Sequence, residues 1–143
     1  MNEALNISGN EIIISSSTNN LSLVRMFIED YGKAIHLSKR EVAHISLAVD
    51  EACTNIIKHA YKNSKDGKIK IRINKKGNKL SVKLIDKGLH FNPQTIPAPN
   101  IEESQKKKKG GGLGIFLMKK IMDEVKYSSN GNSNELLLTK YLA

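Results

Sequence analysis

Two runs of alternating apolar and polar residues place the strongest constraint on the fold. They read KIKIRINK (68–75) and KLSVKLID (79–86), and the KGN between them contains Gly77. Alternation with a period of two puts successive side chains on opposite faces of a strand, and a short glycine-containing loop is typical of a β-hairpin. We therefore expect a sheet with one apolar face that other elements cover.

The remaining segments alternate between strand and helix patterns. We expect a strand at 11–17, helices at 18–35, 37–61 and about 113–123, and a second hairpin at 124–142 that turns at Asn130-Gly131. Asn19 or Asn20 could cap the first helix, and Ser38 with Glu41 forms a capping-box pattern for the second. This order predicts a single α+β domain over 1–143, a two-layer α/β sandwich with a mixed, mainly antiparallel sheet and helices on one face.

Composition narrows the class of protein. Lys and Arg number 23 against 14 Asp and Glu, a net charge of +9 that favours acidic partners. The lysine-rich stretches carry no interleaved aromatic residues, so direct nucleic-acid binding is a minor reading. Cys53 is the single cysteine, which excludes an internal disulfide. No secretory leader or membrane-length apolar run is present, so we expect a cytoplasmic protein without a membrane anchor.

Glu51 and Asn55 lie four residues apart in the second helix pattern, so they share one side of the helix. A carboxylate and a carboxamide together could hold a hydrated Mg²⁺ ion or a hydroxyl group, with the carboxylate accepting a proton. The alternative is a solvated polar face, away from the apolar stripe of Val42, Ile45, Val49 and Ile56.

Asp86 ends an apolar strand pattern and is followed two residues later by Gly88. An ionised carboxylate only accepts hydrogen bonds, so it could bind the exocyclic amine of adenine. Gly88 has no Cβ and would let the backbone approach the ring. The alternative is a strand-ending Asp-x-Gly turn without a ligand.

The stretch GGGLG (110–114) precedes an apolar, helix-like run. Backbone N–H groups of glycines at a helix N-terminus favour a phosphate group. A tight turn without a ligand is the alternative, and no Gly-Lys-Ser/Thr follows that would make it a P-loop. Residues 92–111 form a long polar loop of the kind that usually serves a function. Its Lys106–Lys109 run could reach a phosphate or an acidic partner, although a solvated charge run is the default reading.

In this order the three motifs resemble those of the GHKL (Bergerat) ATPases, the superfamily of gyrases, heat-shock chaperones and histidine kinases. LAVDEACTNIIKHAY resembles the N box of bacterial anti-sigma factor serine/threonine kinases, and GGGLGIFLMKKIMDEV resembles their second glycine box. The resemblance covers about 10–142. His90 departs from the Asp-x-Gly-x-Gly of many members, and Asn92 replaces the aspartate of a Phe-Asp-Pro sequence.

The resemblance implies a role for each matching position. Asn55 would be the Mg²⁺ ligand, and Glu51 would be the general base that accepts the proton of a substrate serine or threonine. Asp86 would bind the adenine amine with Gly88 beside it. The hinge of an ATP lid at about 92–111 and the phosphate-binding helix start would be formed by Gly110, Gly112, Leu113 and Gly114. His59 could contact the nucleotide, although a structural histidine is the default reading, and Cys53 reads as a core thiol.

The implied function is an ATP-dependent protein serine/threonine kinase and anti-sigma regulatory factor. It would phosphorylate an anti-sigma antagonist, sequester a sigma factor and form a homodimer, with ATP and Mg²⁺ as cofactors. A nucleotide-gated regulatory binding module without kinase activity is the alternative.

Overall fold

The computed structural model describes residues 6–7, 9–90 and 111–143; for residues 6–7 and 111–115 it describes the backbone alone. Of the segment predicted as an ATP lid, it includes only Gly111. Asn92, Lys106–Lys109 and Gly110 lie outside the described residues.

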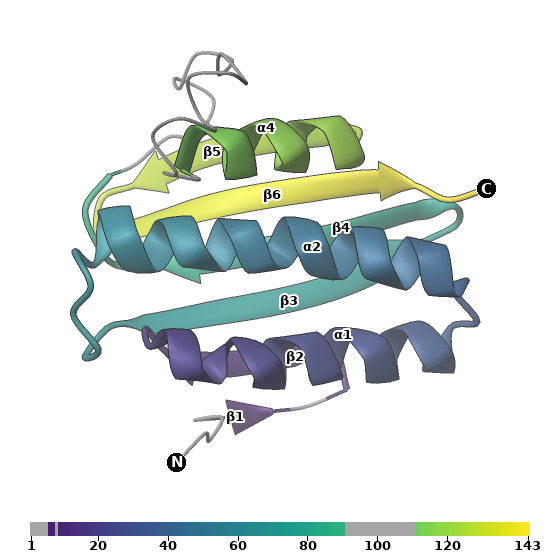
Figure 1. The fold of residues 1–143 in the computed structure, drawn as a ribbon, viewed down its shortest axis with the longest axis horizontal. Coiled ribbons are helices and arrows are strands. Elements are labelled where there is room, and N and C mark those ends of the chain that lie inside the picture. Colours follow the sequence, from purple (N-terminus) through teal and green to yellow (C-terminus); the bar gives the residue numbers. More distant parts are fainter. Residues whose placement is uncertain (1–5, 8, 91–110) are drawn as a thin grey trace.

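Six strands form one twisted sheet in the order β1-β2-β3-β4-β6-β5 (Figure 1). Every neighbouring pair of the described strands is antiparallel, which confirms the mainly antiparallel sheet predicted from the sequence; the mixed character also predicted is not found among these strands. The short edge strand β1 was not predicted. The strands are β1 Asn6–Ile7, β2 Glu11–Ser15, β3 Lys68–Lys76, β4 Lys79–Asp86, β5 Glu124–Asn130 and β6 Ser133–Tyr141.

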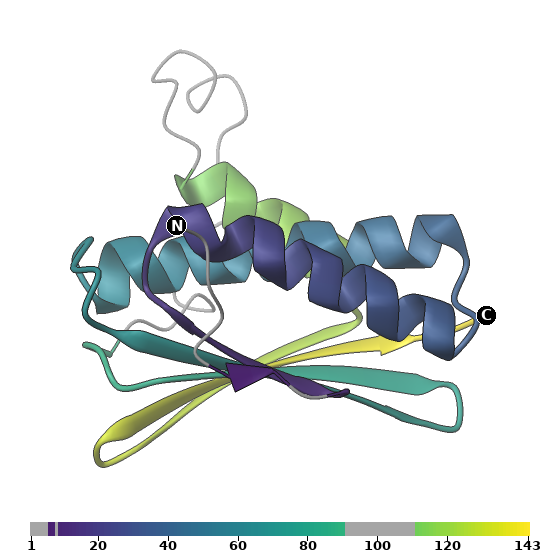
Figure 2. The same ribbon diagram turned by 90° about the horizontal axis from the view of Figure 1, so that it is seen from below.

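The helices all lie on one face of this sheet, as the edge-on view in Figure 2 shows. The two-layer α+β sandwich predicted from the order of elements is therefore confirmed. No helix in the described ranges is both long and apolar enough to cross a membrane. The helical segments are η1 Thr18–Asn20, α1 Leu21–Ala34, α2 Lys39–Asn55, η2 Ile56–Ala60 and α4 Gly111–Ile121.

The β3–β4 hairpin forms the centre of the core. Ile71 lies opposite Leu84 in the register, and Gly77 takes a φ of 63° in the connecting turn, where a side chain would be strained. The alternating isoleucines and leucines of the two strands face the helices and are buried, while most of the lysines between them are exposed. Burial of this apolar face is the main favourable contribution to the stability of the fold.

Helix α2 begins as its sequence predicts. The Ser38 side chain accepts a hydrogen bond from the Glu41 N–H, and the Glu41 carboxylate accepts one from the Ser38 N–H, both at 3.0 Å. This pair satisfies two of the amide groups that a helix N-terminus leaves unbonded. In contrast, Asn20 precedes α1 but makes no side-chain cap; its buried amide donates instead to Ser15.

Candidate functional site

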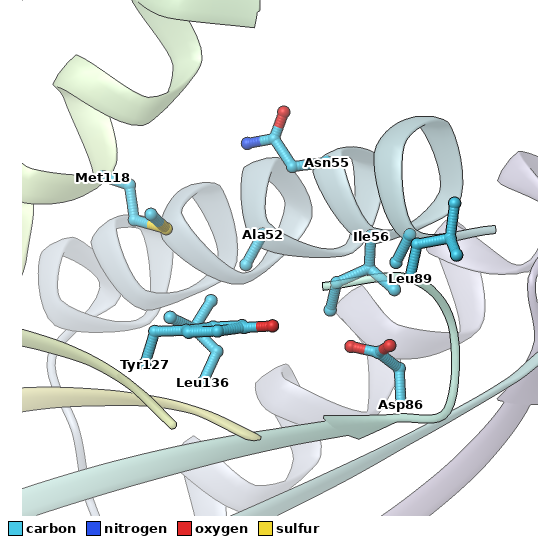
Figure 3. A pocket seen from close by; sticks show the side chains of 9 residues that line it. Ala52, Asn55, Ile56, Asp86, Leu89, Met118, Tyr127 and Leu136 are labelled. Carbon is cyan, nitrogen blue, oxygen red and sulfur yellow. The ribbon is translucent and has the colours of Figure 1, made fainter. Parts of the chain in front are cut away.

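A narrow cavity lies between the C-terminal half of α2 and the sheet (Figure 3). Its volume is about 10 Å³, which is the space of a single water molecule, so a larger ligand requires the lining side chains to move apart. Most of the lining is apolar, and the side chain of Leu89 at the cavity is itself more than half exposed. The lining residues are Ala52, Asn55, Ile56, Ala60, Asp86, Leu89, Met118, Tyr127 and Leu136.

The Asp86 carboxylate is the charged group of this cavity, and it points from the end of β4 towards α2 in Figure 3. Only 5% of the residue is exposed. Its Oδ1 accepts hydrogen bonds from the Gly88 N–H and from the Asn134 amide, both at 2.9 Å, whereas Oδ2 has no hydrogen bond within the described residues. Burial raises the pKa of Asp86 above its usual range, and the two hydrogen bonds oppose that rise. With respect to the part of the chain that the structure describes, Asp86 therefore offers one unoccupied acceptor oxygen inside a largely apolar cavity.

Gly88 follows Asp86 in a turn that packs directly against the end of the long helix. A Cβ at this position would lie 2.5 Å from the carbonyl oxygen of Ala60, which is closer than atoms approach in proteins. The next residue, Leu89, donates its N–H to the same oxygen at 2.8 Å. The contact with the Ala60 backbone is therefore sufficient to require glycine at this position. From the sequence, the expected reason for the glycine was close approach to a bound adenine ring.

Asn55 lies on the helix side of the cavity, and only 5% of the residue is exposed. Its Nδ2 is buried without a hydrogen-bond partner in the described part of the chain. Unpaired buried amides are costly, so this group marks a position where a ligand atom or water would be stabilising. The alternative reading of Asn55 as part of a solvated polar face is therefore wrong. Helix α4 covers this side of α2, and its buried Met118 lines the same cavity as Asn55.

Glu51 lies one turn before Asn55 and is half-buried. Burial, and after it the charge of Asp50, raises the pKa of the Glu51 carboxyl, while Lys58 opposes the rise. Its carboxylate makes no hydrogen bond to any residue that the structure describes. A carboxylate whose pKa is shifted towards neutrality accepts a proton more readily than an ordinary one.

The sequence predicted one helix over 37–61, but the α-helical part ends at Asn55. After Asn55 it widens into the π-helical turn η2, closed by a hydrogen bond of 3.0 Å from the Tyr61 N–H to the Ile56 carbonyl. Directly after this turn, the Tyr61 hydroxyl donates to the Lys68 carbonyl at 2.6 Å and accepts from the Lys87 N–H at 2.8 Å. These bonds tie the end of the helix to β3 and to the turn after Asp86.

The glycine-rich segment forms the start of α4. The helix begins at Gly111, two residues before the predicted start, so Gly112, Leu113 and Gly114 lie in its first turn. Further along α4, Met118 is fully buried and lines the cavity. The structure thus brings α4 and the predicted site residues of α2 and β4 to one region of the fold (Figure 1).

Two residues considered from the sequence lie outside the cavity lining. Cys53 is fully buried in the core, and burial raises the pKa of its thiol, which confirms a structural role. His59 is half-buried, and burial lowers its pKa. Sequence reasoning also missed the Asn134 amide and the Tyr127 ring, since both come from the second hairpin, where nothing in the pattern marks them.

The described residues contain no group of three or more His, Cys, Asp or Glu side chains that could hold a metal ion. Mg²⁺ is commonly bound through one or two protein oxygens together with substrate phosphates and water. The single Asn55 amide therefore fits an ion that arrives with a phosphorylated ligand and does not fit a resident metal centre.

Comparison with known proteins identifies relatives along nearly the whole chain. A family model described as "Histidine kinase-like ATPase domain" matches residues 14–140. The serine-protein kinase RsbW of Listeria innocua is 33% identical over an aligned length of 127, and the alignment covers 85% of this chain and 80% of that protein. The serine-protein kinase RsbW of Bacillus subtilis is 29% identical over an aligned length of 141, and the alignment covers 92% of this chain and 84% of that protein.

Two solved structures share the fold. The RsbU and RsbW domains of Rv1364c from Mycobacterium tuberculosis align with a TM-score of 0.66 at 18% identity, over 92% of this chain and 32% of that one. The histidine kinase domain of a blue-light activated kinase from Erythrobacter litoralis aligns with a TM-score of 0.56 at 16% identity, over 83% of this chain and 61% of that one.

Proposed function

Because the chain belongs to the histidine kinase-like ATPase family, and within it to the anti-sigma factor serine kinases, we propose that it is a protein serine/threonine kinase that uses ATP and Mg²⁺. The observation that carries this proposal is that Asn55 and Asp86 line the same cavity. Among the described residues, the buried Nδ2 of Asn55 has no hydrogen-bond partner and Oδ2 of Asp86 accepts no hydrogen bond. The Asn55 side chain can approach a metal-bound phosphate, and the Asp86 carboxylate can approach a base.

The base-binding end of the site consists of Asp86 and the apolar side chains around it. Oδ2 of Asp86 would accept a hydrogen bond from the exocyclic amine of adenine, and the apolar lining residues Ile56, Met118 and Leu136 would contact the faces of the ring. An acceptor-only group rejects a base that presents a carbonyl oxygen at the same position, because two acceptors would then face each other without water. This selects ATP over purine nucleotides with a 6-oxo group.

The phosphate end combines Asn55 with the start of α4. The side-chain oxygen of Asn55 would hold Mg²⁺, whose chemistry in such a site is to neutralise the charge that develops on the transferred phosphoryl group. The N–H groups in the first turn of α4 favour an anion through the positive end of the helix dipole. Both groups act by positioning and charge and form no covalent bond to the substrate.

Glu51 takes the proton in this proposal. Its carboxylate accepts the hydrogen of the attacking serine or threonine hydroxyl as the oxygen bonds to the γ-phosphorus and the bond to the ADP leaving group breaks. The raised pKa of Glu51 suits this role, since burial makes the carboxylate a better proton acceptor than an exposed one.

The names of the relatives suggest the partners. We propose that the protein substrate is an anti-sigma antagonist, that a sigma factor is sequestered through a separate surface, and that the protein forms a homodimer. Residues 1–143 would act as one ATPase domain, with 92–111 as its lid and Gly110 at the hinge. The net charge of +9 is consistent with acidic partner surfaces.

Two experiments test the proposal. Calorimetric titration should show ATP binding that is tighter with Mg²⁺ than with a chelator. Incubation with γ-labelled ATP and a candidate antagonist should then place the label on a serine or threonine of the antagonist. A chain that binds no ATP under either condition refutes the proposal; one that binds ATP and labels none of the antagonists tested refutes the kinase reaction on those substrates and leaves the binding site intact.

A further inference from the structure

Asn134 is a buried polar residue at the start of β6, close to the proposed base-binding group. It is 2% exposed. Its Nδ2 donates to Asp86 Oδ1 at 2.9 Å and to the Gly88 carbonyl at 2.9 Å, with a longer contact of 3.3 Å to the Leu89 carbonyl. One amide group therefore holds both the Asp86 carboxylate and the turn that follows it.

The orientation of this amide is determined by its partners. Two backbone carbonyls can only accept, so the atom that faces them must be the NH₂ group of Asn134. On the other side, Asn134 Oδ1 accepts from the Ser129 hydroxyl at 3.0 Å. A flipped amide would place its oxygen against the Asp86 carboxylate and both carbonyls, which is strongly unfavourable.

These bonds restrict what Asp86 can present to a ligand. Oδ1 is fully occupied by the Asn134 amide and the Gly88 N–H, so Oδ2 is the acceptor that remains. We propose that Asn134 is a positioning residue that sets base specificity: it fixes Asp86 so that Oδ2 meets a 6-amino purine and rejects a 6-oxo purine. This inference rests on the proposed function, because it assigns a specificity determinant to the same site.

Without the Asn134 amide, only the Gly88 N–H holds the Asp86 carboxyl, so the carboxyl can rotate and take up a proton more readily. A protonated carboxyl can donate to a carbonyl oxygen, so the variant should tolerate the 6-oxo group that the native site rejects. A role that is only structural would weaken both nucleotides equally. The ratio of the two affinities therefore separates positioning from general destabilisation.

The test compares ATP with inosine triphosphate, which carries a 6-oxo group in place of the amine. Calorimetric dissociation constants should show that wild type prefers ATP, and that Asn134→Ala reduces this preference by about tenfold, the value expected for a hydrogen bond to a charged group. Asn20→Ala is the matched control, because Asn20 is also a buried asparagine, 4% exposed, and donates to Ser15 on β2, two strands away from Asp86. Neither Asn20 nor Ser15 lines the cavity. Asn20→Ala should lower the melting temperature and leave the nucleotide preference unchanged.

A second variant, Asn134→Asp, keeps the size of the side chain and replaces the donor with a carboxylate. It should reduce the ATP preference at least as much as Asn134→Ala, and it tests the inference even if the smaller side chain prevents folding. If wild type prefers ATP and both variants keep that preference, the positioning role of Asn134 is overturned while the proposed function stands. If wild type binds neither nucleotide, the proposed function fails, and this inference fails with it.

Discussion

Gly88→Ala should destabilise the protein in the absence of any nucleotide, because the added methyl group has no space beside the end of the long helix. Its Cβ would lie 2.5 Å from the Ala60 carbonyl oxygen and 2.7 Å from the carbonyl carbon. Both are backbone atoms, which cannot rotate aside as a flexible side chain can. The turn after β4 must therefore move away from η2 as a unit.

The cost has two parts. Forcing a methyl group into a packed site costs about 1–3 kcal/mol. Moving the turn also lengthens the 2.8 Å hydrogen bond from the Leu89 N–H to the Ala60 carbonyl, which is worth about 0.5–1.5 kcal/mol. Together the free energy of unfolding should fall by about 2–4 kcal/mol. For a chain of this length, the melting temperature should fall by roughly 5–15 °C.

The assay is thermal unfolding of the ligand-free protein, followed by circular dichroism. Gly9→Ala is the control, because Gly9 is exposed and a Cβ added there would meet no atom within 4 Å. That variant should melt within about a degree or two of wild type, as surface changes usually do. If Gly88→Ala also melts with wild type, the contact with Ala60 does not explain the glycine, and close approach of a ligand becomes the better explanation.

Three further changes test the site and the core. Glu51→Gln should abolish phosphoryl transfer and leave ATP affinity nearly unchanged, because the amide keeps the size of the side chain but cannot accept the proton; equal losses in transfer and titration assays would argue against this role. Asp86→Asn should weaken ATP binding at least about tenfold and yet melt no lower than wild type at pH 7. The reason is that burial raises the folded-state pKa of Asp86, so the wild-type protein gains stability as the pH falls through that value; unchanged ATP affinity would reject the assignment of Asp86. Cys53 should react with a thiol reagent only as fast as the protein unfolds, since it is fully buried; modification of the native protein at the rate of free cysteine would show that the thiol is accessible.

The alternation of apolar and polar residues was sufficient to predict the two hairpins, where burial of a single apolar face determines the structure. The hairpin predicted at 68–75 and 79–86 differs from β3 and β4 by one residue. Its alternating residues can only be buried together if the two strands keep this register. The second hairpin turns at Asn130-Gly131 as predicted, and Gly131 takes a φ of 61° there.

Contacts between distant segments could not be read in the same way. Asn134 bonds to Asp86 across 48 residues, and nothing in the residues around it marks a buried amide. The burial of Asn55 likewise depends on α4, which covers a second side of α2 that a single-stripe pattern treats as exposed. The glycines at 111–114 have low helix propensity, so the pattern put the helix start at Leu113; packing of the later turns, seen in the full burial of Met118, outweighs that preference.

The π-helical turn at Ile56–Ala60 determines the spacing between Asn55, the candidate metal ligand, and Tyr61, whose hydroxyl bonds to β3 and to the turn after β4. Such a turn contains one residue more than the corresponding α-helical turn. Deleting one residue there would let the backbone return to ordinary winding, but it would swing everything beyond by about 100° around the axis. The phenol of Tyr61 would then face away from the Lys68 carbonyl and the Lys87 N–H that it now joins. We therefore expect this short segment to tolerate the substitution of a residue far better than the deletion of one.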